Sequence, residues 1–385
     1  MAPNPHQWLC DKFGQYYATA HPWVPRGEKR EFGFGGWEKK IEFRHLSFAN
    51  EQELAHRLAR EKPLYVSVSS AYYEFPAGRP MAQKNWQGAD LVFDLDAEAH
   101  SCAPFTCVEC FEKIKSNAVA LIEDFLLPDF GLAREELQVS FSGSRGYHVR
   151  VYKKELEPLG REERREIVDY IEGNGLDFNG FFSDEEVSID AGEHGKTSKY
   201  AKLLGPTPQD GGHKGKFARD ILRLVKDAKT AAQVGSKLKD PLEAARFIKG
   251  IEAGRWSDVR INNAKGRFHD LFERLKLHLS EKVETDANVT IDTSKILRLP
   301  DTVHGGSALV AKTIHGAKAL DAFVPSRDAA FLSLSKTERV KTLRAVPSIF
   351  WAGTSTEPLE AEKEAELPES FAAYLVAKKA AVPLG

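Results

Sequence analysis

Two aspartates separated by a single residue lie inside an apolar segment, ADLVFDLDAE, at residues 89–98. The surrounding leucine, valine and phenylalanine residues predict a buried strand. Alternate residues of a strand point to the same face, so Asp94 and Asp96 share a face, with their carboxylates ~6–7 Å apart. Two carboxylates so placed repel each other, and a divalent cation such as Mg²⁺ or Mn²⁺ would use both. The alternative is an exposed strand end whose acids meet water.

A second group of chemically capable residues lies in SFSGSRGYHVRV, at residues 140–151. Ser142, Arg145 and His148 surround two glycines, which allow a sharp turn and a close approach to a ligand. A hydroxyl, a bidentate guanidinium and an imidazole are suitable donors for a triphosphate. The segment is not a Walker loop, because it lacks the G-K-[ST] sequence. A simple hairpin with a glycine turn and a surface arginine would explain it as well.

A third segment, ETDANVTIDTSKILRLPDTVHGG at residues 284–306, adds two acids, Asp286 and Asp292, and several basic residues. Arg298 lies in the apolar sequence ILRLP, where a charge needs an acidic partner or a phosphate. An ordinary salt bridge at the edge of the core is the competing interpretation. His304 is expected in a loop, and it could equally be a plain surface residue.

Three of the four cysteines lie together in HSCAPFTCVECF, at residues 100–111. In a large chain of this kind, such clustering favours a metal over disulfides. His100, Cys102, Cys107 and Cys110 would form a closed, structural zinc site with tetrahedral ligands. Buried or free thiols are the alternative, and a redox role is disfavoured because no thioredoxin-like pattern surrounds the pair.

The elements that must position these residues alternate between strand and helix patterns, which indicates a mixed α/β (α+β) fold. Strands are expected around residues 64–75, 89–98 and 137–152, and helices around 48–62, 108–127 and 160–175. We expect a first catalytic part at 1–205 containing the zinc motif at 100–110, and a small Lys/Arg-rich helical insertion at 206–280. The last catalytic part would follow at 281–350, and an acidic linker with a short amphipathic helix at 351–385.

The composition is that of a globular protein, with 42% hydrophobic residues and a net charge of −2 in 385 residues. A nucleic-acid site must therefore be a local patch. The basic-aromatic stretch VPRGEKREFGFGGWEKKIEFRH is such a patch, and Arg30 within it is a candidate contact to a template. No apolar run is long enough to span a bilayer, and the N-terminus lacks the pattern of a secretion signal. A cytoplasmic location is expected.

Taken together, these segments resemble the small, catalytic subunit of archaeal/eukaryotic-type DNA primase, most closely the archaeal form. GADLVFDLDAE, SGSRGYHVRV and VTIDTSKILRLPDTVHGG carry the resemblance, and REFGFGGWE, SSAYYEFP and MAQKNWQGADLVFDLD extend it. It runs in order over residues 28–316, and the later residues show little of it. The family implies a mixed α/β catalytic fold with helices flanking the sheets, a small helical insertion and a zinc-binding motif.

The resemblance implies roles residue by residue. Asp94, Asp96 and Asp286 would be the catalytic carboxylates that bind Mg²⁺ or Mn²⁺, and Asp292 matches less well. The nucleotide would be bound by Ser142, Arg145, His148, Arg298 and His304. The family makes short primers from nucleoside triphosphates on single-stranded DNA, together with a large subunit that carries an iron–sulfur domain. The zinc loop is short here, and His100 stands where the family often has cysteine.

We therefore expect a two-metal nucleotidyltransferase that makes short RNA primers on single-stranded DNA for DNA replication, with DNA primers as a further option. Related enzymes remain alternatives because they share this chemistry. A primase-polymerase or an end-joining repair polymerase of the same superfamily would have the same motifs. A zinc-stabilised module that binds single-stranded nucleic acid without activity is the alternative from another class.

Overall fold

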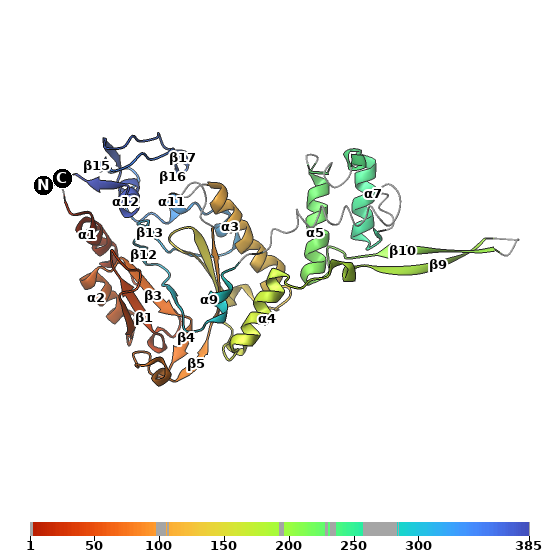
Figure 1. Ribbon diagram of the computed structural model, residues 1–385, viewed down its shortest axis with the longest axis horizontal. Coiled ribbons are helices and arrows are strands. Elements are labelled where there is room, and N and C mark those ends of the chain that lie inside the picture. Colours follow the sequence, from red (N-terminus) through yellow and green to blue (C-terminus); the bar gives the residue numbers. More distant parts are fainter. Residues whose placement is uncertain are drawn as a thin grey trace. The chain divides into compact units, whose positions relative to one another are not determined.

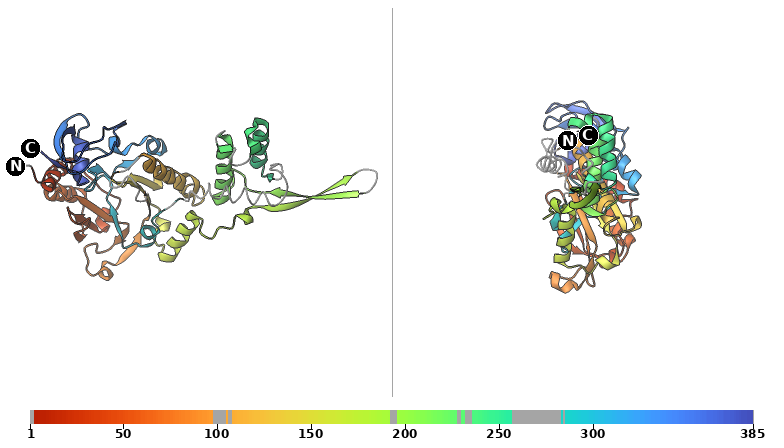
Figure 2. Two further views of the ribbon diagram at one scale, coloured as in Figure 1. Left: turned by 45° about the horizontal axis from the view of Figure 1, so that its top comes forward. Right: turned by 90° about the vertical axis from the view of Figure 1, so that its right-hand side faces the viewer.

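A computed structural model describes residues 3–97, 105, 108–191, 196–227, 230–231, 236–256, 283 and 285–384. The chain forms two compact units (Figures 1 and 2). Unit 1 comprises Met1–Val119, Ala133–Val168 and Thr285–Gly385, and unit 2 comprises Ala120–Leu132 and Asp169–Glu284. Strands and helices mix in both units, which confirms the expected α/β class. The finer domain division at residues 205, 280 and 350 stays a prediction.

The first sheet of unit 1 has the strand order β11-β3-β1-β2, and every neighbouring pair is antiparallel. Its strands are β1 (Phe32–Gly35), β2 (Phe43–Leu46), β3 (Tyr65–Ser69) and β11 (Ile296–Arg298). Helices α1 (Pro5–Tyr17) and α2 (Glu51–Glu61) pack against each other beside this sheet (Figure 1). Pairing of β11 with β3 sets Arg298 opposite Ser67, so the late segment ILRLP lies within the N-terminal half of the fold.

The second sheet of unit 1 carries the paired aspartates and has the order β14-β7-β8-β6. Its strands are β6 (Leu91–Asp96), β7 (Leu137–Phe141), β8 (Gly146–Val151) and β14 (Thr313–Ile314). The expected strand, glycine turn and strand at residues 137–152 are confirmed as β7 and β8. In the antiparallel β6–β8 ladder, Asp94 lies opposite His148 and Val92 lies opposite Arg150.

Most of the expected helices are present. Helix α3 (Val108–Ala120) continues as a π-helical segment, Leu121–Leu126, and ends before Pro128 as predicted. Helix α4 (Arg161–Glu172) is the expected charged helix. The β-branched sequence VTI lies in the short helix α9 (Ala287–Ile291), which Asp286 caps. Short strand pairs complete this part: β4 (Ala71–Tyr73) with β5 (Trp86–Ala89), and β12 (Val303–His304) with β13 (Leu309–Val310).

The C-terminal residues belong to unit 1. They form α10 (Ala317–Ala322), α11 (Pro325–Asp328), β15 (Thr337–Thr342), β16 (Phe350–Trp351), β17 (Thr354–Ser355), β18 (Glu364–Pro368), α12 (Glu369–Ala377) and β19 (Ala381–Pro383). The expected amphipathic character of α12 is wrong, because all nine of its residues are buried. The helix contacts α1 and the β18-β15-β19 sheet, which together cover it on more than one side.

Unit 2 contains an antiparallel hairpin, β9 (Ser183–Ala191) and β10 (Lys196–Leu204), and the helices α5 (Gly212–Lys226) and α7 (Pro241–Glu252). The two helices lie side by side (Figure 2). Their shared apolar core includes Phe217, Ile221, Phe247 and Trp256. Among the described residues, no helix is long and apolar enough to span a membrane.

Candidate active site

A polar cavity of about 220 Å³ opens between residues of the two sheets of unit 1. The β6 pair, Asp94 and Asp96, lies on its wall, as the shared-face argument predicts. The other lining residues include five of the sequence candidates and several that sequence reasoning missed: Lys40, Ile41, Ser67, Ser142, Ser144, Arg145, His148, Ile296, Leu297, Arg298 and His304. Segments far apart in the sequence therefore converge on one cavity.

The two β6 carboxylates are in an unfavourable electrostatic position in the isolated chain. One oxygen of Asp94, Oδ1, is buried without a hydrogen-bond partner, and Nε2 of His148 lies 3.4 Å from it. Burial and the charge of Asp94 raise the pKa of Asp96, although Arg145, His148 and Lys40 oppose the rise. An unpartnered carboxylate oxygen beside a second acid is a suitable donor set for a hard divalent cation.

The third expected carboxylate, Asp286, meets β6 through its backbone. Its amide donates a hydrogen bond of 2.8 Å to the carbonyl oxygen of Asp94. Its side chain caps α9 by accepting from Asn288 N at 3.0 Å, and it lies 3.9 Å from Lys295 Nζ. In the part of the chain that the structure describes, no three acidic, histidine or cysteine side chains gather closely enough to hold a metal. Asp286 is thus adjacent to the pair, but its carboxylate does not converge with theirs.

The glycine turn between β7 and β8 places Ser142, Arg145 and His148 on the cavity wall. The Ser142 hydroxyl accepts from Gly146 N at 3.1 Å, which closes the turn. Gly143 has φ +84°, and a Cβ there would lie 2.7 Å from Cβ of His304. Glycine is therefore required both for the backbone conformation and for the approach of the His304 segment.

Arg298 and His304 come from the segment that enters through β11 and β12. Arg298 is surrounded by protein, and burial lowers its pKa to about 10. It donates to Val66 O at 3.1 Å and lies 4.9 Å from the centre of the Tyr65 ring. Among the described residues it forms no ion pair, so the salt-bridge interpretation is not supported and the charge remains available to an anion.

His304 is buried rather than a plain surface residue. Burial, followed by the charges of Arg298, Lys40 and Lys378, holds its pKa well below the ordinary value. The ring is therefore neutral at physiological pH. Its Nδ1 accepts from Gly306 N at 3.2 Å, which places the proton on Nε2 and makes that atom a donor.

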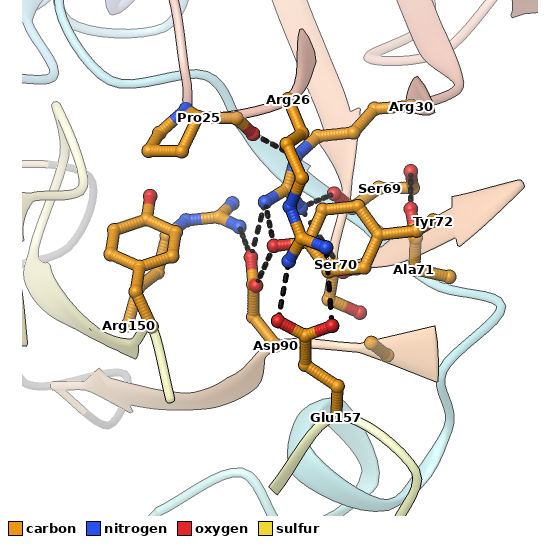
Figure 3. Close-up of polar contacts among 12 residues, drawn as sticks. Pro25, Arg26, Arg30, Ser69, Ser70, Ala71, Tyr72, Asp90, Arg150 and Glu157 are labelled. Atoms are coloured by element: carbon orange, nitrogen blue, oxygen red, sulfur yellow. Dashed lines mark hydrogen bonds and ion pairs between the residues drawn. The ribbon is translucent and has the colours of Figure 1, made fainter. Parts of the chain in front are cut away.

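Arg30, the expected template contact, has a structural position instead. Its side chain is fully buried, and its guanidinium forms a 2.6 Å ion pair with Asp90 (Figure 3). Arg150 approaches the same carboxylate from another side, with Nη1 3.8 Å from Oδ2. The remaining donors of Arg30 bind the carbonyl oxygens of Pro25, Ser69 and Ser70 and the hydroxyl of Tyr72. A side chain engaged in this way cannot contact a template, so we assign Arg30 to the connection between β3 and the start of β6.

The proposed zinc ligands cannot be placed. His100, Cys102 and Cys107 lie outside the described residues, and Cys110 is the third residue of α3. The zinc site stays a prediction.

Sequence reasoning missed Lys40 and Ser67 because neither stands in a distinctive motif. Ser67 alternates with valines in YVSVS, which marks it as facing one side of a strand without indicating which. Lys40 is one of two consecutive lysines in a loop, and only the hairpin geometry selects it.

The chain has extensive similarity to known proteins. A family model described as DNA primase small subunit matches residues 93–315. A DNA primase small subunit PriS from Methanosarcina acetivorans is 31% identical, with 97% of this chain and 95% of that protein covered. The one from Methanocella arvoryzae is 31% identical with 99% of each chain covered, and that from Haloarcula marismortui is 33% identical with 85% and 86% covered.

Proposed function

This chain belongs to the DNA primase small-subunit family, and we propose that the cavity of unit 1 is where it joins nucleotides into primers. Membership makes the chain a nucleotidyltransferase-type enzyme of DNA replication. The convergence of the β6 carboxylates with Arg145, His148, Arg298 and His304 in one cavity is the observation that carries the proposal. The reaction would form a bond between a primer 3′-oxygen and the α-phosphorus of a nucleoside triphosphate and release pyrophosphate.

The acids suit divalent metal ions. Asp94 and Asp96 would hold Mg²⁺ or Mn²⁺, since Asp94 Oδ1 lacks a hydrogen-bond partner and both side chains line the cavity. The side chain of Asp286 caps α9 in the isolated chain, but we propose Asp286 as the third carboxylate because its backbone amide is hydrogen-bonded to Asp94 O. Metal ions bound there would supply Lewis-acid activation of the hydroxyl and neutralise the leaving pyrophosphate.

The cationic and neutral donors of the cavity would hold the triphosphate in line with the primer end. Arg145 offers a bidentate guanidinium, and Arg298 a second, half-buried cation that forms no ion pair among the described residues. His304 contributes a neutral Nε2–H donor to the same wall. Such preorganised donors favour the charge that develops on the leaving group, and no covalent protein intermediate is needed.

The partners follow from the family and stay proposals here. A primase large subunit, a single-stranded DNA template and nucleoside triphosphates would be the molecules that the chain meets. Zn²⁺ at His100, Cys102, Cys107 and Cys110 would be structural.

A priming assay on single-stranded DNA tests the proposal. We expect Asp94→Asn and Asp96→Asn each to reduce primer synthesis by at least about 10³-fold in Mg²⁺ or Mn²⁺. Asp11→Asn, which changes a surface acid paired with Lys62 outside the cavity, is the matched control and should behave as wild type. Near-normal synthesis by the Asp94→Asn, Asp96→Asn double variant would refute the assignment. Supplying ribo- and deoxynucleotides separately, without a primer, distinguishes priming from extension alone.

A further inference from the structure

The cavity holds more positive than negative charge. Its walls carry the cations Lys40, Arg145 and Arg298 against the carboxylates Asp94 and Asp96. In the described part of the chain none of these three cations forms an ion pair. Like charges held together cost free energy unless an anion joins them, and metal ions at the aspartates would increase the excess further.

Lys40 is held at the cavity by the loop between β1 and β2. Gly36 N donates to Lys39 O at 3.0 Å, and Glu42 N donates to Phe34 O at 2.8 Å, so the loop is a closed hairpin. A Cβ at Gly35 would lie 2.1 Å from the carbonyl oxygen of Lys40, which shows how closely the backbone of Lys40 approaches that strand end. The backbone is fixed and the side chain is exposed on the cavity wall.

Lys378 reaches the same region from the other end of the chain. It is the C-cap residue of α12, and its backbone amide donates to Tyr374 O at 2.9 Å. Its ammonium lies 5.3 Å from the centre of the Tyr374 ring and forms no ion pair among the described residues. Burial first, and then repulsion by Arg145 and Lys40, lower its pKa to about 8, and its charge also acts on His304. The next residue, Lys379, lies with its ammonium 4.8 Å from the centre of the Trp37 ring, in the same β1–β2 loop as Lys40, so the end of α12 meets this loop.

Helix α12 is itself firmly positioned. Its first residue, Glu369, accepts a 2.5 Å bond from Lys12 of α1, and every residue of the helix is buried. The backbone of Lys378, at the end of this helix, is therefore held in place.

We propose that Lys40 and Lys378 bind the phosphate chain of the incoming nucleotide beside Arg145, so that the C-terminal segment beyond residues 93–315 completes the nucleotide site. The inference rests on the proposed function. A cavity of about 220 Å³ is smaller than pockets that enclose a drug-sized ligand, so part of a nucleotide would extend beyond its walls. The phosphates are assigned to this end of the cavity because Lys40 lines it together with the carboxylates and the Ser142–Arg145 turn.

Equilibrium binding with the full chain tests the proposal, using ATP and inorganic tripolyphosphate as probes. Lys40→Gln and Lys378→Gln remove one charge each, and we expect each to weaken binding of both probes about tenfold, the loss of one charge-assisted contact. Lys378→Arg should restore most of the affinity. Lys39→Gln and Lys379→Gln are matched controls at the neighbouring positions, because Lys39 does not line the cavity and the ammonium of Lys379 lies over the Trp37 ring. Controls with wild-type affinity support the assignment, and equal losses in the controls overturn it.

A second arm measures binding of a single-stranded oligonucleotide, because its phosphates share the chemistry. Weaker oligonucleotide binding with unchanged ATP affinity would overturn the proposal in favour of a nucleic-acid backbone contact. Should Lys378→Gln fail to fold, Lys40→Gln and Lys378→Arg decide. Wild-type protein that binds neither ATP nor tripolyphosphate would sink the proposed function as well. If the lysine variants bind ATP normally while Asp94→Asn is inactive in primer synthesis, this inference is wrong and the proposed function still holds.

Discussion

The amide of Asp286 donates a hydrogen bond of 2.8 Å to the carbonyl oxygen of Asp94. A second bond, from Thr290 Oγ1 to Val92 O at 2.7 Å, ties α9 to the same strand. These contacts fix the helix beside β6, with Asp286 at its N-terminus. The third acid is therefore brought to the paired acids by the backbone, whereas its side chain is occupied as a helix cap.

An asparagine at position 286 would keep the helix cap and remove the negative charge, so one substitution can test the two roles of Asp286 separately. Asparagine caps helices about as well as aspartate, so Asp286→Asn should leave the thermal midpoint within about 2 °C of wild type. If the charge is needed for metal-dependent synthesis, activity should fall by at least about 100-fold. Asp292→Asn, at the other end of α9, is the control and should retain most activity. Wild-type synthesis by Asp286→Asn would remove this residue from the site.

The raised pKa of Asp96 predicts that its ionised carboxylate destabilises the folded chain at neutral pH when no metal is bound. Burial and Asp94 disfavour the ionised form of Asp96 in the folded chain, so its contribution is favourable at low pH and is lost as pH rises through the raised pKa. Asp96→Asn should therefore increase the free energy of unfolding at pH 7 in EDTA, and the gain should shrink toward about pH 4. Mn²⁺ should stabilise wild type and not the variant. Urea unfolding at several pH values measures both effects.

Ionisation of Asp292 should have the opposite effect on stability, because its pKa is lowered in the folded chain. Burial opposes ionisation of Asp292, but hydrogen bonds from Ser294 outweigh it and lower the pKa. Its contribution is present above the ordinary pKa and is lost as pH falls, so Asp292→Asn should destabilise the protein at pH 7. Both variants shifting stability in the same direction would contradict this explanation.

Sequence patterns located the chemistry because it depends on local spacing. The i, i+2 rule placed Asp94 and Asp96 on one face, and the two glycines predicted the turn that presents Ser142 and Arg145. The same rules could not decide how Asp286 would be used, since capping and metal binding both suit an aspartate before a helix. That choice depends on contacts with β6.

The errors have a common physical cause. The residue types of Arg30 and α12 predict a template contact and an amphipathic helix, whereas the burial of both is decided by partners distant in sequence. Arg30 forms an internal ion pair with Asp90 beside Tyr72. Helix α12 is covered by α1. Lys40 is the opposite case: it lies in a loop without a distinctive motif, yet it lines the cavity.

The buried position of Arg30 predicts a stability effect rather than a binding effect. Arg30→Ala leaves Asp90 buried without its closest cation and should cost about 3–5 kcal/mol. Arg26→Ala, which breaks a more exposed 2.5 Å pair with Glu157, should cost less than about 1 kcal/mol. Urea unfolding measures both. The salt dependence of binding to single-stranded DNA should be unchanged in folded Arg30→Ala, and a slope reduced by about one would restore the template role.

Gly143 predicts coupling between the turn and His304. An alanine there would adopt an unfavourable φ of +84° and place its Cβ 2.7 Å from Cβ of His304. Gly131→Ala is a matched control, because its φ is +60° and its Cβ would meet nothing within 4 Å. Both should lose about 1 kcal/mol of stability from the backbone. Only Gly143→Ala should also raise the KM for nucleotide, and equal kinetics in the two variants would argue against the coupling.

The pKa of Lys378 predicts how nucleotide affinity varies with pH. The charged groups that act on its ammonium are Arg145 and Lys40, and the Tyr374 ring lies beside it. Glu369, at the other end of α12, is paired with Lys12. Since that pKa is lowered to about 8, the lysine is charged below this pH and loses its proton above it. A bound phosphate would raise the pKa again.

ATP affinity should therefore be highest near pH 7, where its phosphates are ionised, and should decline as the pH rises through about 8. Lys378→Arg stays charged throughout and should show no decline in that range. Lys378→Gln should bind more weakly at every pH and be equally flat. A decline that persists in Lys378→Arg would assign the titration to another group, because arginine cannot lose its proton there.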